Sequence, residues 1–212
     1  MGKTNNFTGF LISALAVFIL LCAAPHARAK DFKAMPAIDG GGRWLFAYQN
    51  GVNEVKIMPG PAYGLTFTQV IDFSWSRNMA FEASWLHSRN HGEMTLIAAD
   101  DTEVFNITQD SFCGNIGYFF SGRKFLPYIS GGLGVMAIKY EPESNLNKLW
   151  EQDPMINLGG GLDYTVWEAE VSRALDRVLL GARFRYEYIF VQKVFDVSLT
   201  ALAITARLEL RF

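Results

Sequence analysis

The chain ends with the stretch SLTALAITARLELRF, residues 198–212, and this stretch decides the fold. From Leu202 to the terminal Phe212 every second residue is apolar. The residues between them are mostly polar or charged: Thr205, Arg207, Glu209 and Arg211. A period of two is typical of a β-strand whose two faces meet different surroundings. A strand of this kind needs other strands of the chain to pair with.

The first 29 residues differ from the rest of the chain. Lys3 is the only charged residue before Arg28, and residues 10–24 are almost wholly apolar. Small alanines stand at the two positions that determine cleavage. The pattern predicts a secretory signal peptide over residues 1–29, cleaved before Lys30. One alternative is an uncleaved N-terminal anchor. A lipid-modified Cys22 is a weaker alternative, because Leu21 stands where a lipoprotein signal has a small residue.

Composition limits the function of the mature chain. Without Lys3 and Arg28 it has 17 basic and 21 acidic residues, a net charge of −4. Nucleic-acid binding calls for a basic patch, so no nucleic-acid partner is expected. No apolar run after residue 25 reaches the roughly 18 residues of a transmembrane helix. Cys113 is the only cysteine left, which excludes an internal disulfide and a cysteine metal cluster; it is expected to be a small filler, with a reactive thiol as the alternative.

Alternation of apolar and polar residues recurs along the whole mature chain. With the final stretch it predicts eight strands, at 43–49, 63–75, 81–88, 111–120, 127–135, 156–164, 180–190 and 198–212. Residues 30–42, with a run of three glycines, are predicted to be a flexible periplasmic lead-in. Long polar loops are predicted at 51–60, 89–108, 141–154 and 189–197. Residues 166–176 fit either a turn with a helical piece or the flared ends of two strands.

The eight segments resemble the small OmpA-like barrels of the bacterial outer membrane. The resemblance covers residues 43–212 and includes the glycine-rich stretches 127–134 and 159–164. It implies an all-β fold, an eight-stranded antiparallel up-and-down transmembrane β-barrel that follows a cleaved signal peptide. In that family the assembly machinery reads the terminal aromatic and the apolar residues before it, here Leu208, Leu210 and Phe212. The resemblance also implies outer-membrane lipid and lipopolysaccharide as surroundings, the barrel-assembly machinery as a partner, and a monomer.

The aromatic residues indicate which face of the barrel points outward. Sixteen aromatics share the apolar parity, and each buries roughly 150–250 Å². An eight-stranded barrel has room only for packed side chains or one small ligand. These side chains are therefore expected to face lipid, with Trp75, Trp85, Tyr188 and Phe212 in interfacial girdles. The full set is Trp44, Phe46, Tyr48, Tyr63, Phe67, Phe73, Trp75, Phe81, Trp85, Phe112, Tyr118, Phe120, Phe184, Tyr186, Tyr188 and Phe212.

The opposite parity is expected to line the lumen with charged side chains. Buried charges need partners, and Glu82 and Asp163 are candidate partners of the arginines. We expect charges on the last two strands to pair across those strands and to plug the lumen; a charged ion path is the alternative. The predicted lumen charge network consists of Glu82, Asp163, Arg183, Arg185, Glu187, Arg207, Glu209 and Arg211.

No catalytic site is predicted. Some small barrels are lipid A deacylases, with a His and a Ser one residue apart near the top of the seventh strand; residues 185–189 contain neither. His87 and Ser88 are neighbours on a strand and therefore point to opposite faces. His87, His91 and Glu93 could bind a metal, although a polar strand end explains them as well. The sequence favours a non-enzymatic barrel, without cofactor, in a structural or surface-interaction role. The alternatives are a narrow channel for small or apolar solutes, similar to the OmpW kind, and a lipid A-modifying enzyme.

Overall fold

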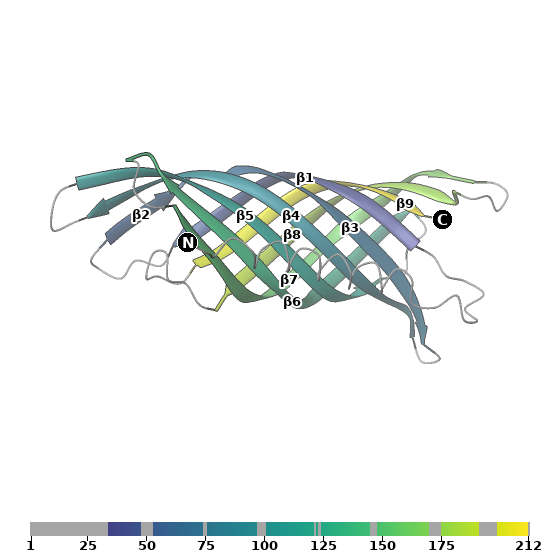
Figure 1. Ribbon diagram of the computed structural model, residues 1–212. Coiled ribbons are helices and arrows are strands. Elements are labelled where there is room, and N and C mark those ends of the chain that lie inside the picture. Colours follow the sequence, from purple (N-terminus) through teal and green to yellow (C-terminus); the bar gives the residue numbers. More distant parts are fainter. Residues whose placement is uncertain are drawn as a thin grey trace. The chain divides into compact units, whose positions relative to one another are not determined.

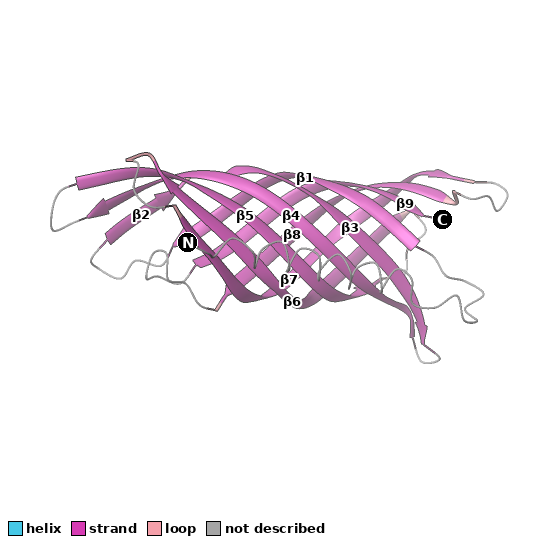
Figure 2. Cartoon of the chain, viewed as in Figure 1, coloured by secondary structure: helices cyan, strands magenta, loops and turns pink. Residues whose placement is uncertain are grey.

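The computed structural model describes residues 34–47, 53–73, 76–96, 101–120, 122, 124–144, 148–169, 175–190 and 199–211. Regular structure in these residues is entirely β-strand (Figure 2). None of them forms a helix long and apolar enough to cross a membrane. The predicted signal peptide, 1–29, lies outside the described residues.

The strands form one antiparallel sheet that closes on itself (Figure 1). Its order is β2-β4-β3-β1-β9-β8-β7-β6-β5, and the pairing of β4 with β5 completes the closure. We call the rim where β1 begins and β9 ends the periplasmic rim, as the sequence predicts, and the opposite one the outer rim. The strands are β1 (Ala34–Ala47), β2 (Asn53–Ile57), β3 (Gly60–Phe73), β4 (Ser76–Leu96), β5 (Asp101–Phe119), β6 (Phe125–Pro142), β7 (Leu149–Glu168), β8 (Arg177–Ile189) and β9 (Leu199–Arg211).

The nine segments make eight barrel strands, because β2 and β3 follow one another along β4. Ile57 pairs with Gly92 of β4, and Ala62 pairs with Ser88 further down the same strand. Pro59 lies at the break, and proline has no N–H to donate to a ladder. The prediction of an eight-stranded antiparallel barrel is confirmed.

Alternation along the strands places apolar residues outside and polar residues inside, as predicted. The exposed apolar side chains form what we call the apolar belt; Leu133 is 69% exposed and Leu158 64%. Arg43 and Glu187, on the inward parity, are 0% exposed. An apolar outer surface of this extent is stable only in lipid. Tyr48, Trp75 and Phe212, which were predicted on the outward face, lie outside the described residues.

The predicted lead-in at 30–42 is wrong for its described part. Residues 34–42 belong to β1 and pair with β3, and residues 37–42 also pair with β9. Gly41, one of the three glycines that suggested flexibility, instead allows close contact between strands. A Cβ atom on Gly41 would lie 2.1 Å from the carbonyl oxygen of Ile204 on β9, which leaves no room for a side chain.

Most of the predicted loop at 89–108 is also wrong, because β4 continues to Leu96 and β5 begins at Asp101. Apolar and polar residues still alternate there, but the apolar residues face inward and the polar residues face outward. Phe105 and Ile107 point inward and are fully buried, while Asn106 and Thr108 point outward. Beyond the apolar belt the outside of the wall meets water, so the apolar side chains face inward.

Two other long connections are shorter than predicted, and residues 191–197 of the predicted connection 189–197 lie outside the described residues. β2 lies within 51–60, and β6 and β7 extend into 141–154. The segment 166–176 contains the end of β7, and β8 begins directly after it at Arg177. A register shift lies between Thr165 and Trp167, and residues 170–174 are outside the described part. We call the portions of β2, β4, β5 and β6 beyond the belt the outer wall; β2, β4 and β5 extend at the left of Figure 1.

The filled lumen as candidate functional site

The charges nearest the outer half of the lumen centre on Glu187 of β8. Its carboxylate forms ion pairs with Arg43 of β1 and, at 2.8 Å, with Arg185 two residues away on its own strand. Arg185 also donates to the hydroxyls of Ser84 and Ser111, at 2.9 Å each. One carboxylate therefore lies between two guanidinium groups in a site closed to water, since Glu187 and Arg43 are 0% exposed.

A second group centres on Glu82 of β4. Arg183 of β8 donates to this carboxylate, and Asn115 donates to it at 2.7 Å. Arg207 of β9 lies 3.8 Å away, within ion-pair distance. Residues separated by about a hundred positions in the sequence thus meet in the middle of the barrel.

The periplasmic half of the lumen is occupied by Arg207 and its neighbours. Arg207 forms an ion pair with Glu209 at 3.1 Å and donates to the Tyr128 hydroxyl at 3.1 Å. Arg211 donates to Glu209 at 2.9 Å. The ring of Tyr128 lies against β7, where a Cβ atom on Gly161 would come within 2.7 Å of its hydroxyl. Glycine at 161 therefore makes room for the tyrosine that contacts Arg207.

The pairing differs from the one predicted. The ladder places Arg183 opposite Thr205 and Glu187 opposite Ala201, so opposite charges on β8 and β9 do not face each other. Arg183 and Glu187 instead find partners across the lumen on β4 and β1. Asp163 is fully buried, yet no hydrogen bond or ion pair joins it to an arginine among the described residues.

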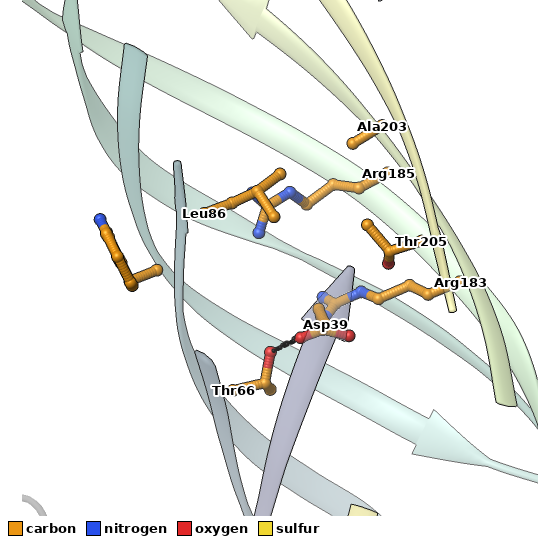
Figure 3. Close-up of a pocket in the computed structure, with 8 residues that line it drawn as sticks. Asp39, Thr66, Leu86, Arg183, Arg185, Ala203 and Thr205 are labelled. Atoms are coloured by element: carbon orange, nitrogen blue, oxygen red, sulfur yellow. Dashed lines mark hydrogen bonds between the residues drawn. The ribbon is translucent and has the colours of Figure 1, made fainter. Parts of the chain in front are cut away.

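Two lumen residues that the predicted network omits are Arg43 and Asp39, both on β1. Asp39 accepts a hydrogen bond of 2.6 Å from Thr66, which in turn accepts one from Arg183 at 3.3 Å. Both side chains point inward, four residues apart on one strand, a spacing visible in the sequence once residues 34–42 are taken as strand. Beside Asp39 and Thr66 lies a cavity of about 10 Å³, which is room for roughly one water molecule (Figure 3).

The outer half of the lumen is filled by apolar side chains. Phe105, Ile107, Met136 and Leu199 are all 0% exposed. Val55, Ile57 and Met94 of the outer wall pack against this cluster. Cys113 belongs to it as a buried free thiol, in the filler position expected from the sequence. The apolar layer lies above the charged layers in the lumen.

The two histidines of the described chain lie on the outward face of β4, above the apolar belt. The Nδ1 atom of His87 lies 2.9 Å from an oxygen of Asp110, and that of His91 lies 3.3 Å from the Asn106 side-chain oxygen. No three His, Cys, Asp or Glu side chains of the described residues converge as metal ligands. The sequence did not suggest the contact of His87 with Asp110, because both residues fell at the edges of a predicted loop.

No family model and no curated protein matches the chain, but solved structures do. Neisserial surface protein A is 14% identical, with 85% of this chain and 97% of that chain covered and a TM-score of 0.53. OprG of Pseudomonas aeruginosa is 13% identical, with 87% and 97% covered and a TM-score of 0.54. The outer membrane enzyme PagL is 17% identical, with 82% and 97% covered and a TM-score of 0.39. The chain therefore has the fold of the small eight-stranded β-barrels to which these outer-membrane proteins belong.

Proposed function

We propose that this barrel has a sealed lumen and a structural or surface-interaction role, and that it is neither a channel nor an enzyme. The observation that supports the proposal is the close packing of buried side chains in the described part of the lumen. Charged layers built around Glu82 and Glu187 occupy the inner part, and the apolar layer around Phe105 occupies the outer part.

The ion pairs support a closed lumen on energetic grounds. An ion that crossed the barrel would have to separate pairs such as Arg43 with Glu187, which are fully removed from water. Separating a buried pair leaves an uncompensated charge and costs several kcal/mol, by general estimates about 3–5. The apolar layer adds a second obstacle, because an ion there would have no polar partner.

The same packing argues against a path for apolar solutes. Phe105, Ile107 and Ile138 of the outer layer are at most 1% exposed. A cavity in the described part of the lumen, beside Asp39 and Thr66, has the volume of only about one water molecule. The outer wall, with the exposed Glu54 and Lys56 on β2, supplies the surface for interactions outside the membrane.

Planar-bilayer recording of the purified barrel, with mass spectrometry of lipid A from cells that express it, tests the proposal. We expect no steady conductance and unchanged lipid A. A conducting porin recorded in the same bilayers is the control for sensitivity. A steady wild-type current would establish a channel in place of the sealed barrel, and loss or gain of an acyl chain on lipid A would establish an enzyme.

A further inference from the structure

A compact group of aromatic and polar side chains lies where the apolar belt ends on the outer side. Tyr63 of β3, His87 of β4 and Asp110 of β5 are neighbours in register on three adjacent strands. Below them, toward the lipid, the outward residues are apolar: Leu65, Trp85 and Phe112. Above them are Arg89 and Thr108. The group thus stands at the level where lipid tails give way to headgroups.

The group is held in one arrangement by its own contacts. Asp110 Oδ1 accepts a hydrogen bond from Trp85 Nε1 at 3.0 Å and lies 2.9 Å from His87 Nδ1. The Tyr63 ring lies 4.9 Å from the His87 ring and 6.0 Å from the Trp85 ring. Among the described residues neither Asp110 Oδ2 nor His87 Nε2 has a hydrogen-bond partner. Both side chains are 22% exposed, so a ligand can reach them.

Arg89 adds a positive charge beside this group. It follows His87 by two residues on the same outward face, about 7 Å along the strand. Its side chain is exposed, and it forms no ion pair with a described residue. The nearby lysines differ, since Lys139 and Lys148 both pair with Glu141, at 2.7 and 2.8 Å.

We propose that Tyr63, His87, Arg89 and Asp110 bind the phosphorylated glucosamine headgroup of lipid A in the outer leaflet. The guanidinium of Arg89 binds a phosphate, because its planar N–H groups can form two parallel hydrogen bonds with phosphate oxygens. Asp110 Oδ2 and His87 Nε2 accept hydrogen bonds from sugar hydroxyls or amides. The ring of Tyr63, 55% exposed, provides an apolar surface for the sugar.

Charge alone would not distinguish lipid A from an anionic phospholipid, but the composition of the group does. A glycerol phosphate headgroup presents a phosphate with few donors and no flat sugar face. An acceptor pair and an aromatic ring beside a cation suit a phosphorylated sugar. The inference rests on placement of the barrel in lipid and not on the sealed lumen, so a positive conductance result would leave it standing.

The test is native mass spectrometry of the full barrel in detergent, titrated with diphosphoryl lipid A, dephosphorylated lipid A or phosphatidylglycerol. We expect diphosphoryl lipid A to bind most tightly. Arg89→Gln should weaken it by about tenfold or more, as loss of a charge-assisted hydrogen bond predicts. Tyr63→Leu, which keeps an apolar side chain on the outside, should weaken both forms of lipid A. Lys124→Gln is the matched control, because it removes an exposed cation near the periplasmic rim.

Heat modifiability on gels shows that each variant has folded. If Arg89→Gln binds diphosphoryl lipid A as tightly as wild type and Lys124→Gln do, the site is not there. If phosphatidylglycerol binds as tightly as lipid A and is weakened equally by Arg89→Gln, the surface is a general anion contact and the assignment to lipid A is wrong.

Discussion

Replacing Glu187 by glutamine tests how strongly the charged lumen stabilises the barrel. The substitution keeps the volume of the side chain and removes the charge that Arg43 and Arg185 share. Arg185 would retain the hydroxyls of Ser84 and Ser111. Apart from a hydrogen bond to the new glutamine oxygen, Arg43 would retain, among the described side chains, only the Met136 sulfur at 3.8 Å. Most of the cost therefore comes from Arg43.

Removing one member of a buried ion pair typically costs about 3–5 kcal/mol. The glutamine oxygen can still accept one hydrogen bond from Arg43, so we expect a loss near the lower figure, about 3 kcal/mol, in the free energy of unfolding. The assay is a reversible urea titration in lipid vesicles, followed by tryptophan fluorescence. Glu168→Gln is the matched control, because it breaks the exposed pair with Arg177 and should cost less than about 1 kcal/mol.

A second variant separates the charge from the packing. Arg43→Met combined with Glu187→Leu removes both charges of this pair and leaves Arg185 its hydrogen bonds to Ser84 and Ser111. It should recover part of the stability lost by Glu187→Gln, because apolar replacements of buried pairs are often neutral or stabilising. If Glu187→Gln costs no more than Glu168→Gln, the lumen charges are solvated or mobile, and the account of a closed, ion-paired core is wrong.

Two further predictions concern the outer face and the end of the chain. Leu133→Arg, at a position 69% exposed in the apolar belt, should cost about 2–4 kcal/mol in the same titration, whereas Gln152→Arg beyond the belt should cost less than about 1 kcal/mol; equal costs would contradict the placement of the belt in lipid. Deletion of Phe212 should reduce the amount of heat-modifiable barrel in outer membranes, and unchanged amounts would show that the predicted signal at Leu208, Leu210 and Phe212 is not needed for assembly.

The sequence by itself determined the architecture and the orientation of its two faces. Alternation is a local property of the sequence, so the last strand and the other seven strands of the barrel can be predicted without any contact information. The sixteen aromatic side chains of one parity are too large to fit inside a barrel of eight strands, so they must face outward. Together these two observations fix which residues point into the lumen, including Arg183, Arg207 and Glu209.

Only the tertiary structure decided which of these residues meet. Which side chains meet across the lumen depends on the register of every strand pairing between them. A local sequence pattern does not give these registers. Glu187 pairs with Arg43, 144 residues away, and Asp163 has no arginine partner within the described residues. The outer wall was missed for a related reason. Beyond the belt the outer face of the strands meets water in place of lipid, so the apolar residues lie on the inner face. The apolar residues therefore change from even to odd positions near Asp110, and in the sequence this change resembles the end of a strand.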